Sequence, residues 1–232
     1  MNIIVTGASR GIGYELVKQF SANSQATIFA VSRNLQKLEQ LKKECVHSNV
    51  IPLVCDISKE DDIKKMVSEI KKHTGAIHFF VNNAGAIVNK PFLELTLADQ
   101  EYVYKVNVFS VMSLIQRLLP MMDENSRSHI VNISSMGGFQ GSAKFAGLSA
   151  YSSSKAALAC LTECLAEEFK DKNISFNCLA LGAVQTEMLN EAFPGYQAPV
   201  SAPEMASYIS DFVLNAHKIM NGKIVPVSLS TP

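Results

Sequence analysis

Hydrophobic residues along the chain follow two alternating patterns. Short runs of apolar, mostly β-branched residues predict strands, and longer segments with an apolar residue every three or four positions predict helices. The predicted strands are Asn2–Thr6, Thr27–Ser32, Val50–Cys55, Ile77–Val81, His129–Ser134, Ser175–Ala180 and Lys223–Val227. The predicted helices lie near Ile12–Ala22, Leu35–Cys45, Lys59–Lys72, Leu97–Asp123, Tyr151–Lys170 and Pro203–Asn215.

This alternation predicts an α/β fold, with a parallel sheet covered by helices on both faces. Several strands are apolar at nearly every position, as expected when both faces of a sheet are buried. The chain of 232 residues shows no internal repeat and no linker, so we expect a single domain over residues 1–232. The loosest stretch, Glu191–Ala202, lies within residues 187–203, which we expect to form a substrate loop.

Composition excludes several classes of protein. The formal net charge is zero, so no basic surface indicates a nucleic-acid partner. No apolar run approaches the roughly 20 residues that span a bilayer. Because a strand is predicted from Asn2 onward, we expect no signal peptide and a cytoplasmic location. The five cysteines form no CxxC pair, so we expect reduced thiols and no metal site.

In a parallel α/β sheet, ligands bind beyond the carboxyl ends of the strands, so the residues that follow each strand are the candidate site. After the first strand comes the sequence TGASRGIG at residues 6–13. Glycines allow a tight turn there, and its backbone N–H groups, with the start of the next helix, can bind a phosphate. An ordinary glycine-rich turn is the alternative interpretation.

The second predicted strand is followed by Ser32, Arg33 and Asn34. Sites for NAD usually carry an acidic residue here, which binds the 2′-hydroxyl of the ribose, and this chain has none. The planar guanidinium groups of Arg33 and Arg10 suit a 2′-phosphate instead, which favours NADP(H) over NAD. The alternative is that both arginines are simply exposed.

Small or polar residues also follow the next four strands. Asp56 and Ile57 follow the third strand, where the carboxylate could bind an adenine amino group or cap the next helix. A serine after the fifth strand could donate a hydrogen bond to a carbonyl oxygen as negative charge develops on it. The remaining candidates are Asn83, Ala84 and Gly85 after the fourth strand, Ser134 and Ser135 after the fifth, and Gly182, Val184 and Thr186 after the sixth.

Tyr151 and Lys155 lie one helical turn apart at the start of a predicted helix. A free tyrosine has a pKa of about 10, and a nearby ammonium group favours the phenolate and lowers this value. The pair is therefore a candidate general acid and base. On its own, such a pair could equally be a half-buried ring beside a solvated charge.

Together these motifs resemble the short-chain dehydrogenase/reductase family, in its single-domain branch. The resemblance rests on TGASRGIG at 6–13, Asp56, NNAG at 82–85, Asn107, Ser135, the YxxxK motif at 151–155 and Gly182 to Thr186. It implies a three-layer α/β/α, doubly wound Rossmann-type sheet of seven parallel strands in the order 3-2-1-4-5-6-7. It also implies hydride transfer between a nicotinamide and a carbonyl or alcohol.

The resemblance further implies a role for each motif residue. Tyr151 would be the general acid or base, Lys155 would lower the Tyr151 pKa and bind the nicotinamide ribose, and Ser135, rather than Ser134, would polarise the carbonyl. Asn107 would hold a water in the proton relay. The implied cofactor contacts are Gly7, Ser9, Arg10, Gly11, Ile12, Gly13, Ser32, Arg33, Asn34, Asp56, Ile57, Asn83, Ala84, Gly85, Tyr151, Lys155, Gly182, Val184 and Thr186.

The chain departs from the family pattern in three places. Leu181 replaces the usual proline before Gly182, and the usual pair of glycines is absent from the end of the chain, residues 228–232. The spacing between Ser135 and Tyr151 is a few residues longer than usual, so we expect the segment Ser142–Phe145 to shape the substrate pocket.

The sequence therefore predicts an NADP(H)-dependent carbonyl reductase that acts on a small-molecule carbonyl or alcohol. By resemblance, it would form a homodimer or homotetramer through the helices near Leu97–Asp123 and Tyr151–Lys170. One alternative is a nucleotide-binding sensor or scaffold with the same fold and no turnover. Another is a sugar-nucleotide epimerase or dehydratase, although such chains usually carry a larger C-terminal domain than the about 45 residues that follow Thr186.

Overall fold

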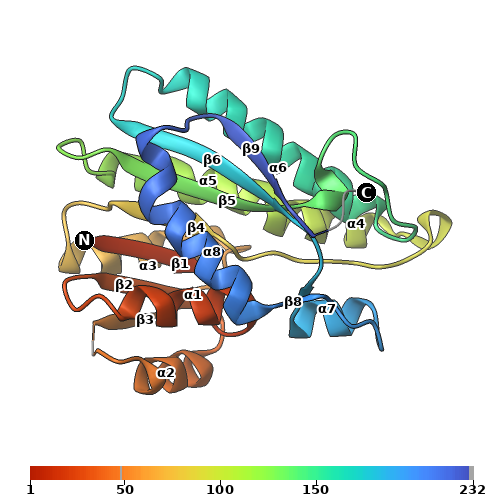
Figure 1. Cartoon of the computed structure of the whole chain (residues 1–232), viewed down its shortest axis with the longest axis horizontal. Coiled ribbons are helices and arrows are strands. Elements are labelled where there is room, and N and C mark those ends of the chain that lie inside the picture. The colour runs from red at the N-terminus through yellow and green to blue at the C-terminus, as the bar shows by residue number, and fades with distance from the viewer. Residues whose placement is uncertain (48, 230–232) are drawn as a thin grey trace.

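A sheet of seven parallel strands runs through the middle of the computed structural model, which describes residues 1–47 and 49–229 (Figure 1). The strand order is β3-β2-β1-β4-β5-β6-β9, which confirms the predicted order with β9 as the seventh strand. The strands are β1 (Asn2–Thr6), β2 (Thr27–Ser32), β3 (Val50–Val54), β4 (Phe79–Asn82), β5 (Ser128–Ser135), β6 (Ile174–Leu181) and β9 (Lys223–Val227).

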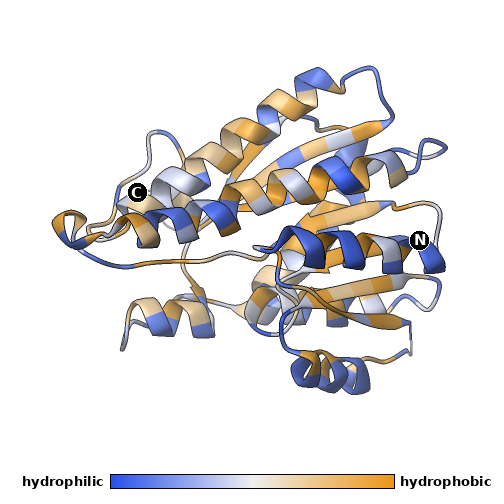
Figure 2. Ribbon diagram, turned by 180° about the vertical axis from the view of Figure 1, so that it is seen from behind, coloured by the Kyte–Doolittle hydropathy of each residue, from blue (hydrophilic) through white to orange (hydrophobic). Residues whose placement is uncertain are grey.

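Helices cover both faces of this sheet. One face packs against α1 (Gly11–Ser21), α2 (Leu35–Glu44) and α8 (Ala202–Asn215). The other packs against α3 (Glu60–His73), α5 (Ser110–Leu118) and α6 (Ser149–Glu168), with α4 (Leu97–Tyr104) beside α6. Figure 2 shows the result, with hydrophobic strands in the middle and hydrophilic positions on the outward sides of the helices.

Two separate cores explain why the strands are apolar at almost every position. In β1, Ile3 and Val5 point into the core beneath α1 and α8, whereas Ile4 between them points into the core beneath α3 and α5. Neighbouring side chains of a strand alternate between its faces, so a strand buried on both sides needs apolar residues throughout.

The segment predicted to be helical near Leu97–Asp123 is helical over residues 97–121, but it is not one regular α-helix. The segment consists of α4, a π-helical turn at Lys105–Phe109, α5 and a 3-10 turn at Leu119–Met121. The π turn contains Asn107, whose side chain bonds to the backbone of Ala86, and Pro120 follows the end of α5. A π turn inserts one residue into a helix, and proline lacks the N–H group needed to continue one. The other predicted elements shift by at most two residues at their ends.

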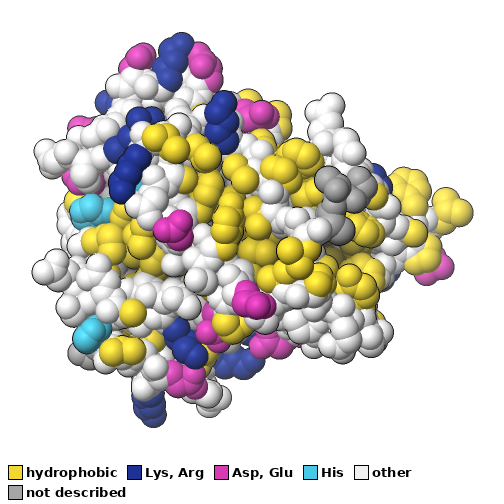
Figure 3. All heavy atoms as spheres, in the orientation of Figure 1, with side chains coloured by type: hydrophobic (Ala, Val, Ile, Leu, Met, Phe, Trp, Pro, Cys, Tyr) yellow, Lys and Arg dark blue, Asp and Glu magenta, His cyan; other side chains and the backbone are white. Residues whose placement is uncertain are grey.

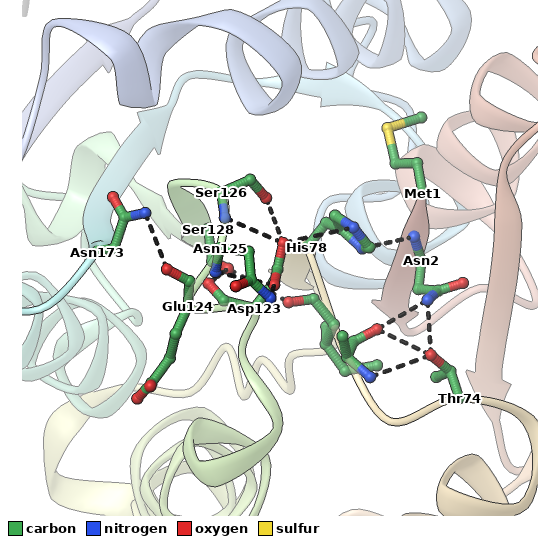
Figure 4. Close-up of polar contacts among 12 residues, drawn as sticks. Met1, Asn2, Thr74, His78, Asp123, Glu124, Asn125, Ser126, Ser128 and Asn173 are labelled. Atoms are coloured by element: carbon green, nitrogen blue, oxygen red, sulfur yellow. Dashed lines mark hydrogen bonds and ion pairs between the residues drawn. The ribbon is translucent and has the colours of Figure 1, made fainter.

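Loops at the amino ends of the strands are held together by their own polar groups (Figure 4). The Asn2 backbone N–H donates to His78 Nδ1 at 3.0 Å, and the Asn2 side chain donates to Thr74 Oγ1 at 2.7 Å. The Asp123 carboxylate accepts from the backbone N–H of Ser126 at 3.1 Å and lies 3.7 Å from His78 Nε2. This edge of the sheet is therefore closed by hydrogen bonds within the chain.

The opposite edge carries two projections (Figure 1). One is α7 (Glu187–Ala192), which is flanked by the short paired strands β7 (Val184–Gln185) and β8 (Val200–Ser201). The other follows β4 and includes a 3-10 turn at Phe92–Glu94. Within residues 1–47 and 49–229, no helix has the length and apolar composition needed to cross a membrane. Of the unusual C-terminal residues, 230–232 lie outside the described part of the chain.

Candidate active site

A cavity of about 840 Å³ opens along the carboxyl ends of the strands. This volume is within the range of about 300–1,000 Å³ that is typical of sites for cofactors and small molecules. The structure brings together in its lining most of the predicted site residues, namely Gly7, Ser9, Arg10, Gly11, Ile12, Ser32, Arg33, Asn34, Asp56, Ile57, Asn83, Ala84, Gly85, Ser135, Tyr151, Lys155, Gly182, Val184 and Thr186. Gly13 and Asn107 lie behind this lining rather than in it.

The glycine-rich turn after β1 depends on backbone conformations and close contacts that only glycine tolerates. Gly7 and Gly11 have positive φ angles of 70° and 55°. A Cβ atom on Gly13 would lie 2.4 Å from both the Gly7 carbonyl oxygen and Asn83 Nδ2, so Gly13 lets α1 pack directly against the turn. The turn and the first N–H groups of α1 thus form a cradle that fits a phosphate.

Thr6 joins this turn to the loop after β4, a role that sequence reasoning missed. Its Oγ1 accepts hydrogen bonds from the backbone N–H groups of Asn83 and Ala84, both at 3.1 Å. The Asn83 side chain in turn donates to the Thr6 carbonyl oxygen at 2.9 Å. The sequence offered only one signal for this role, a threonine at the end of a strand. It could not indicate the bonding partner, because Asn83 is 77 residues away in the sequence.

Arg10, which we expect beside Arg33 around a 2′-phosphate, lines the cavity with Arg33 and is ion-paired in this structure. Its guanidinium group forms a two-point ion pair with the Glu191 carboxylate of α7, in which Nη2 lies 3.1 Å from Oε2. Hydrogen bonding from Arg10 lowers the pKa of Glu191. Arg33 and Lys37, the latter missed by sequence reasoning, also line this end of the cavity.

Asp56 lies at the same end of the cavity as Arg33. Its Oδ1 accepts hydrogen bonds from the Ser58 backbone N–H at 3.1 Å and from the Ser58 hydroxyl at 2.7 Å. Burial raises the Asp56 pKa, but the hydrogen bonds from Ser58 and the charges of Arg33 and Lys59 lower it by more. The net effect is a pKa below the ordinary value, so the carboxylate is ionised at neutral pH. Neither Asp56 nor Ser58 caps α3, because Lys59 occupies the N-cap position.

The two serines at the end of β5 point in different directions. The Ser134 hydroxyl donates to the backbone carbonyl oxygen of Lys155 at 2.8 Å, so its one hydrogen is already used in a bond within the chain. The Ser135 hydroxyl accepts from the Gly137 N–H at 3.2 Å and forms a hydrogen bond with Tyr151. Neighbouring residues of a strand face opposite ways, so only one of the two can lie beside Tyr151.

Burial dominates the protonation of Tyr151 and Lys155. It raises the pKa of Tyr151, against the smaller opposing effect of the Ser135 hydrogen bond. It lowers the pKa of Lys155 to about 8. Lys155 Nζ donates to the Ile133 carbonyl oxygen at 2.8 Å and lies 5.9 Å from the centre of the Tyr151 ring. Lys155 is not among the groups that shift the Tyr151 pKa in this structure, and the Tyr151 hydroxyl is neutral at neutral pH.

Asn107 lies behind the cavity lining, next to Lys155. Its side-chain oxygen accepts from the Ala86 N–H at 2.8 Å, and its amide group donates to the Ala86 carbonyl oxygen and to Ser154 Oγ, both at 2.9 Å. Both amide hydrogens are thus used within the chain. A Cβ on Gly85 would lie 3.3 Å from Lys155 Nζ and 3.4 Å from Asn107 Oδ1, so these two groups meet against the same glycine.

Beyond Tyr151 the cavity is lined by apolar side chains that sequence reasoning did not identify individually. They come from loops and from α7, where no motif marks them. Among them are Ile87, Met136, Phe145, Leu148, Met188, Phe193 and Tyr196. Phe145 lies in the segment that the longer spacing had indicated, as does Ala143, which also lines the cavity. In the described part of the chain, no group of three or more His, Cys, Asp or Glu side chains is arranged to hold a metal ion.

Comparison with known proteins gives a consistent result. Residues 1–197 match the family model described as short chain dehydrogenase. The ketoacyl reductase HetN of Nostoc sp. is 31% identical over 207 residues, which are 88% of this chain and 69% of that protein. The 3-oxoacyl-(acyl-carrier-protein) reductase FabG of Thermotoga maritima is 32% identical over 187 residues, which are 80% of this chain and 74% of the relative.

Solved structures share the fold. A 3-ketoacyl-(acyl-carrier-protein) reductase from Brucella melitensis, complexed with NADH, has a TM-score of 0.86 at 22% identity and covers 97% of this chain and 96% of its own. At this identity the likeness shows the fold alone. A second Brucella melitensis protein, described as a short-chain dehydrogenase/reductase, has a TM-score of 0.87 at 26% identity, with 97% and 94% covered.

Proposed function

The chain belongs to the short-chain dehydrogenase family of oxidoreductases, and from this premise we propose that it reduces carbonyl compounds with NADPH. One observation carries the proposal. A half-buried, neutral Tyr151 interacts with the Ser135 hydroxyl in a cavity whose lining also includes a glycine-rich phosphate cradle. The cavity can therefore hold a dinucleotide with its reactive end beside a proton donor.

Tyr151 supplies the proton in this proposal. When bound, the cofactor would supply a hydride to the carbonyl carbon, and the electron pair of the C=O bond would move onto oxygen. The Tyr151 hydroxyl then gives its proton to that oxygen, which leaves an alcohol and a tyrosine phenolate. Burial favours the protonated tyrosine before the reaction, which suits the direction of carbonyl reduction.

Ser135 and Lys155 stabilise the charges that develop. The Ser135 hydroxyl lies beside Tyr151, where it can donate to the carbonyl oxygen as negative charge grows on it. Lys155 has a pKa of about 8, so most of its side chains are ammonium ions at neutral pH, and this charge stabilises the phenolate that remains. Asn107 keeps the Ala86 segment and Ser154 in place beside Lys155. A water held by Asn107 stays a prediction from the family.

Residues at the other end of the cavity support NADPH as the cofactor. No acidic residue follows β2, where NAD sites usually bind the ribose 2′-hydroxyl. Arg33 and Lys37 supply positive charge there instead, which suits a 2′-phosphate. In this proposal the Asp56 carboxylate, which lines the same end of the cavity, accepts from an adenine amino group. The Brucella melitensis 3-ketoacyl-(acyl-carrier-protein) reductase of the same fold was solved with NADH, so the fold alone does not decide between the two cofactors.

A cofactor-oxidation assay tests the proposal. The purified protein is mixed with NADPH or NADH and a panel of ketones and aldehydes, and loss of the reduced cofactor is followed optically. We expect carbonyl-dependent oxidation with a higher kcat/KM for NADPH than for NADH. If NADPH binds but is not oxidised with any carbonyl, the protein is the nucleotide-binding sensor instead.

We also propose that copies of the chain associate through α5, α6 and the π turn. Phe109 and Met112 are 59% and 39% exposed on this side, and association would remove these apolar side chains from water. Sedimentation of the purified protein measures the assembly, and a monomer would contradict this proposal. The cytoplasmic location remains a prediction from the sequence.

A further inference from the structure

Apart from Lys155, the charged side chains in the described lining lie in one part of the cavity. The part beyond β1, β2 and β3 is lined by Arg10, Arg33, Lys37 and Asp56. Glu187 also belongs there, because its Oε2 lies 3.5 Å from the position of a Cβ on Gly11. In the part beyond β4, β5 and β6, Lys155 is the only charged lining residue among those that the structure describes. The strand order separates the two parts, because β1 and β4 meet in the middle of the sheet.

Apolar side chains line the part around Tyr151. They come from three segments, namely the loop after β4, the loop before α6, and α7 with the residue that follows it. The six that matter here are Ile87, Met136, Phe145, Leu148, Met188 and Phe193. Met136 and Leu148 are buried, whereas Phe145 is 51% exposed and lies at the mouth. On the face drawn in Figure 3, hydrophobic side chains likewise gather from the middle of the molecule toward its right-hand projection.

Asn89 and Lys90 tie these three segments together. Asn89 Nδ2 donates to the Ala192 carbonyl oxygen of α7 at 2.9 Å, and the Lys90 N–H donates to the Gly147 carbonyl oxygen at 3.0 Å. Gly147 has a φ of 83°, and a Cβ there would lie 2.1 Å from Asn89 Oδ1. The apolar walls are therefore held in fixed positions relative to one another.

We propose, on the basis of the carbonyl reductase function above, that the substrates are uncharged carbonyl compounds with an apolar ring or chain beside the carbonyl. A carboxylate or phosphate placed among these side chains would lose its hydration without gaining a free cation. Lys155 already donates to Ile133, and its charge serves Tyr151. An apolar group would instead gain from leaving water. The proposal excludes 2-oxo acids and sugar phosphates.

Matched pairs of ketones test this substrate class. Neutral aryl, alicyclic and straight-chain ketones are each paired with an analogue of similar size that carries a carboxylate, for example para-methylacetophenone with para-acetylbenzoate. The reduced cofactor is supplied at saturation and kcat/KM is measured for each ketone. We expect roughly 30-fold or more preference for the neutral member of each pair. Equal or better reduction of the charged members would overturn the proposal.

Phe145→Arg provides a second test, because it places a cation at the mouth of the apolar part. We expect the preference for neutral ketones to fall about tenfold, mainly because the KM for the carboxylate-bearing ketones becomes lower. Leu93→Arg is the matched control, since it adds the same charge at a site that is 95% exposed and outside the cavity lining. An unchanged preference in Phe145→Arg, with NADPH still bound, would show that Phe145 does not face the substrate.

The two levels of the proposal fail in different ways. If the natural protein oxidises NADPH only with charged carbonyls, the substrate class is wrong and the reductase function stands. If NADPH binds and no ketone of either kind is reduced, the reductase function is wrong and the substrate class falls with it.

Discussion

The two edges of the sheet use similar polar residues in opposite ways. At the amino edge, the His78 ring accepts a hydrogen bond from the Asn2 backbone N–H and faces the Asp123 carboxylate, so the polar groups of the loops there are paired with one another (Figure 4). At the carboxyl edge, Lys155 is buried and Tyr151 half-buried at the side of a cavity, and the loss of hydration shifts the pKa of both toward the uncharged form. The comparison indicates that the amino edge stabilises the fold, whereas the carboxyl edge gives up stability to hold reactive groups.

The largest effect is expected for Tyr151→Phe at the carboxyl edge. It removes the hydroxyl that gives the proton, so kcat should fall by about 100-fold or more. The ring remains, so NADPH affinity and the unfolding midpoint should stay nearly the same. Single-turnover kinetics and NADPH titration measure these quantities. Near-normal turnover would remove Tyr151 from the mechanism.

Lys155→Met should lower kcat by less than Tyr151→Phe does, and it should also change how stability depends on pH. The Lys155 pKa is about 8 in the folded protein against an ordinary 10.5, so between these values the unfolded chain binds more protons. The unfolding free energy of the natural protein should therefore rise by up to about 3 kcal/mol from pH 8 to 10.5, beyond any rise in the variant. Urea unfolding at both pH values measures this.

Lys65→Met, at an exposed position of α3, is the control for that experiment. Its unfolding free energy should rise with pH as much as that of the natural protein. If Lys155→Met shows the same rise as the natural protein, burial of Lys155 is not a source of instability, and the contrast between the edges is lost.

Gly13→Ala tests the phosphate cradle. The new Cβ would lie 2.4 Å from the Gly7 carbonyl oxygen, a backbone atom that cannot move without displacing the turn. Such overpacking costs about 1–3 kcal/mol, so NADPH should bind about 10- to 100-fold more weakly. Gly75→Ala is the matched control near the amino edge, because a Cβ there meets nothing within 4 Å. Equal NADPH affinities of the two variants would argue against the cradle.

Asp123→Ala tests the amino edge. It removes the acceptor of hydrogen bonds from Asn125 and Ser126, and we expect the unfolding free energy to fall by about 1–2 kcal/mol. Because the site lies at the other edge, kcat/KM at a temperature where the variant is folded should not change. Asp171→Ala, at an exposed turn, is the control for stability. A loss of kcat/KM in folded Asp123→Ala would break the separation of the two edges.

The smallest effect is expected for Glu191→Gln. The Arg10–Glu191 ion pair is partly exposed, so it contributes about 0.2–1 kcal/mol. Releasing Arg10 to a cofactor phosphate should raise NADPH affinity by up to about fivefold. Glu94→Gln, on the other projection, should leave the affinity as it is. Weaker NADPH binding by Glu191→Gln would mean that the ion pair shapes the site rather than competing with the cofactor.

Much of the fold could be predicted because its signals are local. Runs such as Asn2–Thr6 are apolar since both faces of β1 are buried, and the glycines of residues 6–13 are required by the turn itself. Tyr151 and Lys155 are likewise one turn apart on a single helix, so their proximity follows from spacing alone.

What escaped prediction depends on contacts between distant segments. The π turn at Lys105–Phe109 places Asn107 against Ala86 and Ser154, and nothing within the turn indicates these partners. The ion pair of Arg10 joins residues 181 positions apart. Apolar residues around Tyr151 lie in loops without periodicity, so no pattern distinguished them from ordinary core positions.

Isotope transfer tests the central claim most directly. NADPH that carries deuterium at the hydride-donating carbon of the nicotinamide is incubated with the protein and a neutral ketone, and the alcohol is analysed by mass spectrometry and NMR. We predict that deuterium appears on the carbinol carbon and that it is transferred from one face of the nicotinamide only. Tyr151→Phe should lower the rate of this transfer about 100-fold. An alcohol without deuterium on that carbon, or NADPH bound with no alcohol formed, would contradict hydride transfer at this site.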